Sequence, residues 1–187
     1  DVGLLLKTAT TSDDTQATLT LQTGDTDIAA NDVIGQLHFQ APDEGTGTDA
    51  ILVAAGIAAI SEGNFAADNN ATSLVFKTGA SEAAAEKVRI NSTGYLGIGT
   101  TAQVAPLVVS NGGASGMEFH PELTTNTNRF VNYNRSGSAY NKLKVDALEQ
   151  QFFISGNEQM RLTTNGVLAA NAGVALGVGL NNTASNV

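Results

Sequence analysis

The side chains that could carry acid–base or metal chemistry are few in this sequence. His38 and His120 are the only histidines, and each stands beside a phenylalanine, in LHFQ and EFHP. Histidine can exchange protons near neutral pH or ligate a metal, but a metal site needs at least one further ligand. No third ligand is spaced to suit this pair. We therefore predict two histidines on the polar faces of strands.

Acidic residues form two short clusters, whose loop oxygens are the kind of ligand that calcium takes. The clusters are Asp25, Asp27 and Asp32, and Asp43, Glu44 and Asp49. Neither cluster has the spacing of an EF-hand, so we interpret both as solvated turns. Paired carboxylates for glycoside hydrolysis are defined by their separation in space and not by sequence. The absence of Trp and the presence of only 3 Tyr argue against a sugar-stacking cleft.

The glycine-rich stretch GYLGIG does not indicate a dinucleotide site, because its order is G-x-x-G-x-G and no βαβ pattern surrounds it. We find no constellation of nucleophile, base and orienting group in the sequence. The prediction is a protein that is not an enzyme, with no catalytic residues, no metal site and no cofactor.

Charge and composition exclude further classes of function. The 187 residues include 9 Lys+Arg against 18 Asp+Glu, a net charge of −9, so a nucleic-acid partner is not expected. There is no Cys, which excludes disulfides, thiolate catalysis and Cys-ligated zinc. No stretch approaches the roughly 20 apolar residues of a membrane span, so we predict no membrane insertion.

Short runs in which apolar and polar residues alternate predict half-buried β-strands. Turn-forming Gly, Asn, Ser and Thr separate these runs, as expected of an all-β chain. The predicted strands are 17–23, 35–40, 74–77, 106–110, 116–120, 129–133, 142–146 and 151–155.

One segment, 49–61, fits two structures. Its many alanines and the aspartate at its start favour a helix of about three turns. Against this, Gly56 lies in the middle, and the series Ile51, Val53, Ala55, Ile57, Ala59 fits a period of two. We favour a strand here, and at most one helical turn at 83–85.

The sequence contains an internal repeat. Glu86-Lys-Val-Arg89-Ile recurs as Glu158-Gln-Met-Arg161-Leu, and the turn glycines Gly94 and Gly166 follow at the same spacing in both copies. Upstream, FKTG at 76–79 matches FISG at 153–156, and Phe39 matches Phe119. Downstream, LGIG at 96–99 returns as LGVG at 176–179. The offset between the copies is not constant along this series, which indicates that loops carry insertions.

Within each repeat the local chemistry predicts a hairpin. Val88 and Ile90 share one face, and Arg89 points to the other; NSTG at 91–94 then forms a turn, as TNG does at 164–166. Arg89 and Arg161 each follow a glutamate by three residues, so we expect ion pairs with Glu86 and Glu158, within or between chains. In the return strand Leu96 and Ile98 point inward, which leaves Gly97 and Gly99 on a bare face. Such a face either admits another backbone, as three copies wound about one axis would require, or marks a bulge.

These residues carry a family resemblance. The pattern Glu86-x-x-Arg89-Ile90 followed by Gly94-x-Leu96-Gly97-Ile98-Gly99-Thr100 resembles the ERMRI…G-x-VGIGT signature of tail-fibre and receptor-binding proteins of tailed bacteriophages. The upstream segment, from IGQLHFQ to SLVFKTG, is similar to the segment before that signature in the same proteins. The resemblance covers residues 33–101, with 116–179 as a degenerate second copy.

The resemblance implies an elongated, intertwined homotrimeric fibre or knob on the outer surface of a virion, in a tail or head fibre. It divides the chain into an N-terminal β segment for shaft or attachment (1–32), two degenerate β-repeats (33–104 and 105–180) and a tail (181–187). The implied partners are two further copies of the chain, other virion proteins and a host surface glycan or protein.

The implied function is host attachment by a structural module. The alternatives are a capsid-decorating or head-fibre protein and a polysaccharide-degrading tailspike. No receptor-binding residue can be assigned, although 126–140 holds the densest mixture of aromatic and cationic side chains: Arg129, Phe130, Tyr133, Arg135 and Tyr140. Those residues either anchor contacts with a receptor or simply belong to two strands that pack together, and we favour the second interpretation.

Overall fold

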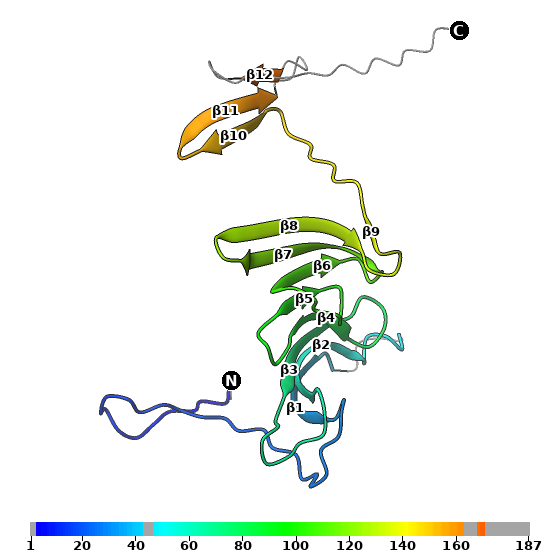
Figure 1. The fold of residues 1–187 in the computed structure, drawn as a ribbon. Helices are drawn as coiled ribbons and strands as arrows, with labels where there is room; N and C mark the ends of the chain where they lie inside the picture. The colour runs from blue at the N-terminus through cyan, green and yellow to red at the C-terminus, as the bar shows by residue number, and fades with distance from the viewer. Residues whose placement is uncertain (1–2, 43–46, 163–167, 171–187) are drawn as a thin grey trace. The chain divides into compact units, whose positions relative to one another are not determined.

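The chain is all-β in a computed structural model that describes residues 3–42, 47–162 and 168–170 (Figure 1). No helix occurs in these residues, and so no described helix is long and apolar enough to cross a membrane. The chain forms two compact units that divide between Lys142 and Leu143. The trimeric arrangement expected from the sequence involves other chains and stays a prediction.

The described residues of the first unit form one sheet of nine strands, in which each strand pairs with the next strand along the chain. All neighbours in the sheet are antiparallel except β5 and β6, which are parallel. The strands are β1 (Val33–Gln40), β2 (Val53–Ser61), β3 (Thr72–Thr78), β4 (Ala85–Ile90), β5 (Leu96–Ile98), β6 (Leu107–Ser110), β7 (Ser115–Thr124), β8 (Thr127–Asn134) and β9 (Ala139–Tyr140).

The second unit contains a three-stranded antiparallel sheet of β10 (Gln150–Ile154), β11 (Asn157–Leu162) and β12 (Leu168–Ala170). β10 and β11 form a tight hairpin whose turn places Ser155 and Gly156 at positive φ. Glycine adopts this conformation at no steric cost, which explains why FISG ends in glycine.

The alanine-rich segment is a strand, as the period-two pattern predicted. β2 starts at Val53 and pairs on both sides, with β1 and with β3. A Cβ on Gly56 would lie 3.0 Å from the Leu37 carbonyl oxygen, so the neighbouring strand approaches closely at this position. Pairing on two sides therefore overrides the helix propensity of alanine. The single helical turn allowed at 83–85 does not form; 83–84 are irregular and Ala85 is the first residue of β4.

Two predicted strands are wrong. Residues 17–23 and 142–146 adopt no strand in the structure. Both have the alternating pattern, but alternation only supplies two faces, and a strand also needs a hydrogen-bonding neighbour. Segment 17–23 instead lies against β1, where a Cβ on Gly35 would come within 2.9 Å of the Leu21 Cβ.

One face of the nine-stranded sheet is apolar from β1 to β8, and we call it the apolar face. The strand registers align its side chains in two adjacent rows that cross the sheet. One row holds Leu37, Ile57, Phe76, Val88, Ile98, Val109 and Met117; the other holds Ala59, Leu74, Ile90, Leu96, Leu107, Phe119 and Phe130. Phe76 is 37% exposed and Leu37 is 48% exposed, so this face is only partly covered by the described chain.

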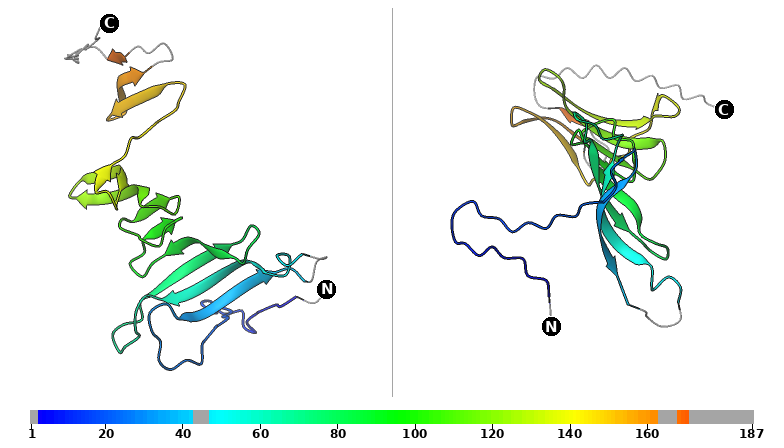
Figure 2. Two further views of the ribbon diagram at one scale, coloured as in Figure 1. Left: turned by 90° about the vertical axis from the view of Figure 1, so that its right-hand side faces the viewer. Right: turned by 90° about the horizontal axis from the view of Figure 1, so that it is seen from below.

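Most of the buried side chains of the described residues lie on the opposite face of the same sheet. Its central row contains Ala58, Val75, Val108, Glu118 and Val131, which are at most 6% exposed. Small and β-branched side chains allow the chain's own loops to close over this row, and Ala105 of the β5–β6 loop is also buried. The core is therefore small and lies on the face that carries the charged residues. Figure 2 shows the sheet from two further directions.

A β-bulge explains the Glu-x-x-Arg motif. Residues three apart on a regular strand point to opposite faces, which would separate Glu86 from Arg89. In β4 the register shifts so that Lys87 is an extra residue between the pairs Lys77–Glu86 and Phe76–Val88. The bulge returns both side chains to one face, and Arg89 donates to both carboxylate oxygens of Glu86 at 2.8 and 2.7 Å.

The second copy has the same bulge at the equivalent residue, Gln159. Arg161 Nε donates to Glu158 at 2.7 Å, and Arg161 also reaches Glu149 at 3.2 Å. The predicted ion pairs of both arginines are thus present within the chain. Because the bulge and the pair recur together, the motif specifies the position at which each strand shifts its register.

The glycines of LGIG are explained by contacts within the chain, which corrects the expectation of a bare face. Gly97 is buried, because the loop after β5 folds over it: a Cβ there would lie 2.7 Å from the Thr100 carbonyl oxygen. Gly99 has a φ of +68°, and a Cβ there would lie 2.1 Å from the Ser110 carbonyl oxygen. Another backbone does approach both residues, but it belongs to the same chain.

Strand pairing also corrects the alignment of the repeat. Arg89 pairs with Gly97, and Arg161 pairs with Ala169, so β12 occupies the place of β5 with the same spacing from its arginine. The LGVG motif and the TNG turn lie outside the described residues. The boundary between the two compact units falls inside the predicted second repeat, after β9.

Candidate functional site

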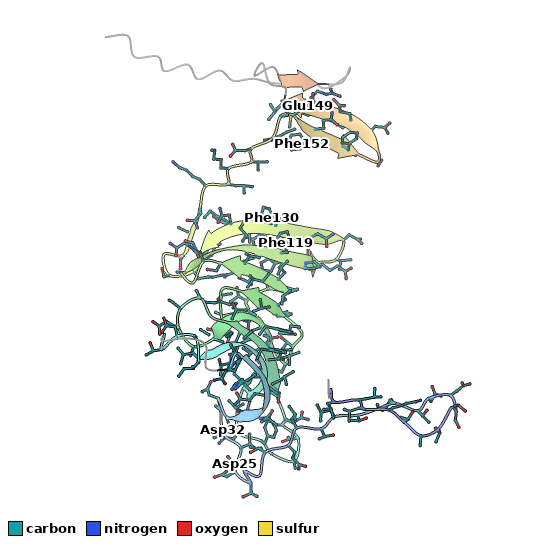
Figure 3. The ribbon with its side chains drawn as sticks, turned by 180° about the vertical axis from the view of Figure 1, so that it is seen from behind. Asp25, Asp32, Phe119, Phe130, Glu149 and Phe152 are labelled. Carbon is teal, nitrogen blue, oxygen red and sulfur yellow. The ribbon has the colours of Figure 1, made fainter. Side chains whose placement is uncertain are left out.

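Six polar and aromatic side chains from β7, β8, β9 and the turn after β8 meet on the buried-core face of the sheet. We call them the β7–β9 cluster: Glu118, His120, Arg129, Tyr133, Arg135 and Tyr140. Antiparallel register places His120 opposite Arg129, and Tyr133 opposite Tyr140. On the other face of the same strands, the rings of Phe119 and Phe130 lie 4.8 Å apart (Figure 3).

Glu118 is the centre of the cluster and is 1% exposed. Arg135 donates from Nε to Oε1 at 2.7 Å and from Nη2 to Oε2, and His120 Nε2 lies 2.9 Å from Oε2. Burial alone would raise the pKa of Glu118, but the hydrogen bonds and charges of Arg135 and His120 outweigh it and hold the pKa below its ordinary range. An ionised carboxylate only accepts hydrogen bonds, so His120 carries its proton on Nε2.

The two arginines are joined by the two tyrosines. The guanidinium of Arg135 lies 4.9 Å from the centre of the Tyr133 ring, which contacts the Tyr140 ring edge-on at 5.2 Å. Arg129 Nη2 donates to the Tyr140 hydroxyl at 3.0 Å, and its guanidinium lies 5.8 Å from that ring. Two of the chain's three tyrosines are therefore gathered between two cations.

The charges of the two arginines are not compensated in the same way. Arg135 uses two of its nitrogens on Glu118. Within the described residues, no carboxylate lies within 4.0 Å of Arg129. The cluster thus carries a net positive charge in a chain whose total charge is −9.

A hollow of about 180 Å³ opens at the cluster, lined by Glu118, Arg129, Val131, Tyr133, Arg135 and Tyr140. This volume is below the roughly 300–1,000 Å³ of sites for drug-sized ligands, so the hollow suits a single small group. A larger hollow of about 460 Å³ lies between the β4 bulge and the loops after β5 and β6. Its charged side chains are Lys87 and Glu86, and Glu86 is already paired with Arg89. The larger hollow also has no aromatic lining, so the cluster is the better candidate site.

The structure does not bring the two histidines together. His38 lies on β1 and His120 on β7, with five strands between them in the sheet. In the described part of the chain, no three His, Asp or Glu side chains gather so as to hold a metal.

The acidic clusters belong to turns where they can be described. The Asp25 carboxylate accepts from the Asp27 amide at 2.9 Å, and Asp32 accepts from the Ala29 amide at 2.7 Å. Both residues are labelled in Figure 3. Asp43 and Glu44 lie outside the described residues. These hydrogen bonds are typical of aspartates that close turns.

Sequence reasoning selected 126–140 but interpreted it as two packed strands, and it missed Glu118. β8 and β9 are indeed paired strands, and their side chains also form the cluster. A signal for Glu118 was present, because Glu118 and His120 flank Phe119 in a strand and must share its polar face. Its partner Arg135 follows β8, 17 residues after Glu118 in the sequence. Period-two alternation gives no information about contacts between residues that far apart.

No protein-family model matches the sequence, and no curated protein shows significant similarity to it.

Proposed function

We propose that this protein is a structural, non-enzymatic component of a bacteriophage virion, a homotrimeric fibre module that attaches the particle to its host. The observation that carries the proposal is the apolar face of the nine-stranded sheet. The short motifs that resemble those of phage fibre proteins support the proposal that the assembly is a phage fibre.

The apolar face is large enough to require a partner. Nine of its side chains are large, apolar and at least 36% exposed: Leu37, Leu74, Phe76, Ile90, Ile98, Val109, Met117, Phe119 and Phe130. At roughly 70 Å² each, they leave on the order of 600 Å² of contiguous apolar surface. Monomeric proteins rarely expose more than a few hundred Å² in one patch, and stable interfaces bury about 800 Å² per partner.

A further copy of the chain is the partner that fits this surface. Both rows hold apolar side chains on every strand from β3 to β7, so no residue of these two described rows is a charged group that would select a different protein. Packing three such faces together leaves the opposite face, with the β7–β9 cluster, at the surface of the assembly. That arrangement gives the protein a hydrophobic interior and a polar exterior suited to attachment.

The test of assembly is the mass of the full chain in solution by light scattering. We expect three times the 19.1 kDa of the single chain. Leu74→Asp, in the apolar face, should lower the mass to that of a folded monomer or abolish folding. The matched control is Leu148→Asp, because Leu148 is 82% exposed and lies outside both sheets. A wild-type chain that is a stable monomer would overturn the proposal.

The place of the protein on the virion is tested by labelling intact particles with an antibody against the chain. Label at tail fibres supports the attachment role. Label spread over the head supports the capsid-decorating alternative instead. Incubation of the trimer with host polysaccharide tests the tailspike alternative, because release of new reducing ends would show that the protein is an enzyme.

A further inference from the structure

We propose that the β7–β9 cluster is a binding site for an anionic saccharide unit, a single pyranose ring that bears a carboxylate or phosphate group. Arg129 binds the anion and Tyr140 packs against the ring. The inference deepens the proposed attachment function and rests on it only for the source of the sugar.

The charge argument identifies Arg129 as the residue that binds the anion. Glu118 compensates the charge of Arg135, while Arg129 has only a neutral partner, the Tyr140 hydroxyl, at 3.0 Å among the described residues. A guanidinium offers five N–H donors in a planar fork, and one contact with a hydroxyl leaves donors free. The Arg129 side chain is half-buried, so an incoming anion would meet a cation that is partly shielded from water. Carboxylate and phosphate oxygens match this fork in charge and geometry.

The aromatic argument identifies Tyr140 as the platform for the ring. Tyr140 is 71% exposed, more than any other aromatic residue among the exposed large apolar side chains of the described chain. Its edge-on contact with Tyr133 holds the ring in place, and the hydrogen bond from Arg129 fixes its hydroxyl. An ordered aromatic ring beside hydrogen-bond donors is the usual lining of a site for a small polar ligand with apolar faces.

Glu118 has a positioning role in this site. Its buried carboxylate holds Arg135 against Tyr133 at 4.9 Å, which in turn supports Tyr140. The volume of about 180 Å³ limits the bound group to about one ring. The acidic chain repels anions at long range, so affinity for the sugar must come from this local contact and should fall with salt only modestly.

The experiment measures binding of defined sugars to the immobilised full-length protein. The probes are a glucuronate-containing tetrasaccharide, the same tetrasaccharide with its carboxylates reduced to alcohols, and glucose 6-phosphate. We expect the carboxylate or the phosphate probe to bind at least tenfold more tightly than the reduced sugar. Binding of the carboxylate probe alone or of the phosphate probe alone assigns the anion; equal binding of the reduced sugar overturns the proposal.

The variants test the named residues. Arg129→Gln should weaken binding of the anionic probe at least tenfold, and Tyr140→Leu should weaken both the anionic and the neutral probe. Lys144→Gln is the matched control, because Lys144 is an exposed cation outside the cluster whose partner is Asp146 at 3.1 Å. Unchanged affinity in Arg129→Gln, or absence of binding to every probe by the wild type, would refute the site.

The oligomeric mass of each protein is measured in the same samples. A monomeric wild type that still binds the anionic sugar through Arg129 would overturn the proposed trimer and leave the site standing. A trimeric wild type that binds no probe would refute the site and leave the proposed trimer standing.

Discussion

The two glycines at positive φ in the first repeat allow a quantitative test of close backbone packing. Gly94 has a φ of +80° and nothing within 4 Å of where a Cβ would be, while Gly99 has a φ of +68° and the Ser110 carbonyl oxygen at 2.1 Å. Alanine at either position has to adopt the left-handed conformation, which costs about 1–2 kcal/mol. Only at Gly99 must it also displace a backbone.

The extra cost at Gly99 can be estimated from the hydrogen bonds that hold the contact. The Gly99 amide donates to the Lys87 carbonyl at 2.8 Å, and the Gly112 amide donates to the Gly99 carbonyl at 3.0 Å. Moving Ser110 away strains or breaks these bonds, each with a net value of about 1 kcal/mol. We therefore expect Gly94→Ala to cost about 1–2 kcal/mol and Gly99→Ala about 3–4 kcal/mol.

Urea unfolding followed by circular dichroism measures this difference. Protein concentration must be equal in all samples, because association with other copies would shift the midpoint by mass action. The midpoint of Gly99→Ala should be well below that of Gly94→Ala, or the variant should fail to fold while Gly94→Ala folds. Equal midpoints for the two variants would refute the reasoning from close packing.

Further predictions concern the ion pairs and the loop over β5. Arg89→Ala should lower the free energy of unfolding by about 1 kcal/mol, because it removes a bidentate ion pair with Glu86 whose side chains are only 16–20% exposed. The trimer and host binding should remain, because the role of this pair is structural. Loss of binding from a folded trimer would contradict this. Glu118→Gln should destabilise the protein at pH 7, and the difference from wild type should shrink as the pH falls through the lowered folded-state pKa of Glu118, because a depressed carboxylate pKa contributes its full stability above the unfolded value of about 4.3 and loses it between that value and the folded-state pKa; unfolding curves with a constant difference from pH 7 to pH 2 would argue against it. Gly97→Ala should lower stability but leave the oligomeric mass unchanged, because the Thr100 loop of the same chain covers this residue; a change of mass in a folded variant would restore the intermolecular interpretation.

Much of the fold follows from patterns in the sequence. Period-two alternation found most of the strands of the main sheet, and the Glu-x-x-Arg repeat identified β4 and β11 as equivalent strands. Alternation failed at 17–23 and 142–146, because it describes which face a side chain prefers and not whether a neighbour is present. The sequence left two interpretations of the glycines at 97 and 99, a close approach of another backbone or a bulge, and no pattern in it marks the backbone at Thr100 and Ser110 of the same chain that approaches them.

The candidate site was predictable only in part. The density of Arg and Tyr at 126–140 is visible in the sequence, and these residues do lie together. Their arrangement depends on Glu118, which comes from the preceding strand and joins the cluster through pairing of β7 with β8. Which arginine keeps a free charge depends on the distance to a carboxylate, and only the three-dimensional structure gives that distance.

The sequential order of strands in the main sheet has a consequence for how the chain folds. Among the described strands, the hydrogen-bonded neighbours in this sheet are consecutive along the chain from β1 to β9, so the loops that must close are short and contact order is low for an all-β protein. Strands can therefore join the sheet one at a time as the ribosome releases them, with the most recent strand serving as the template for the next. We expect the sheet of each chain to form quickly, and the meeting of separate chains, a step of higher kinetic order, to limit the rate at which the mature assembly appears.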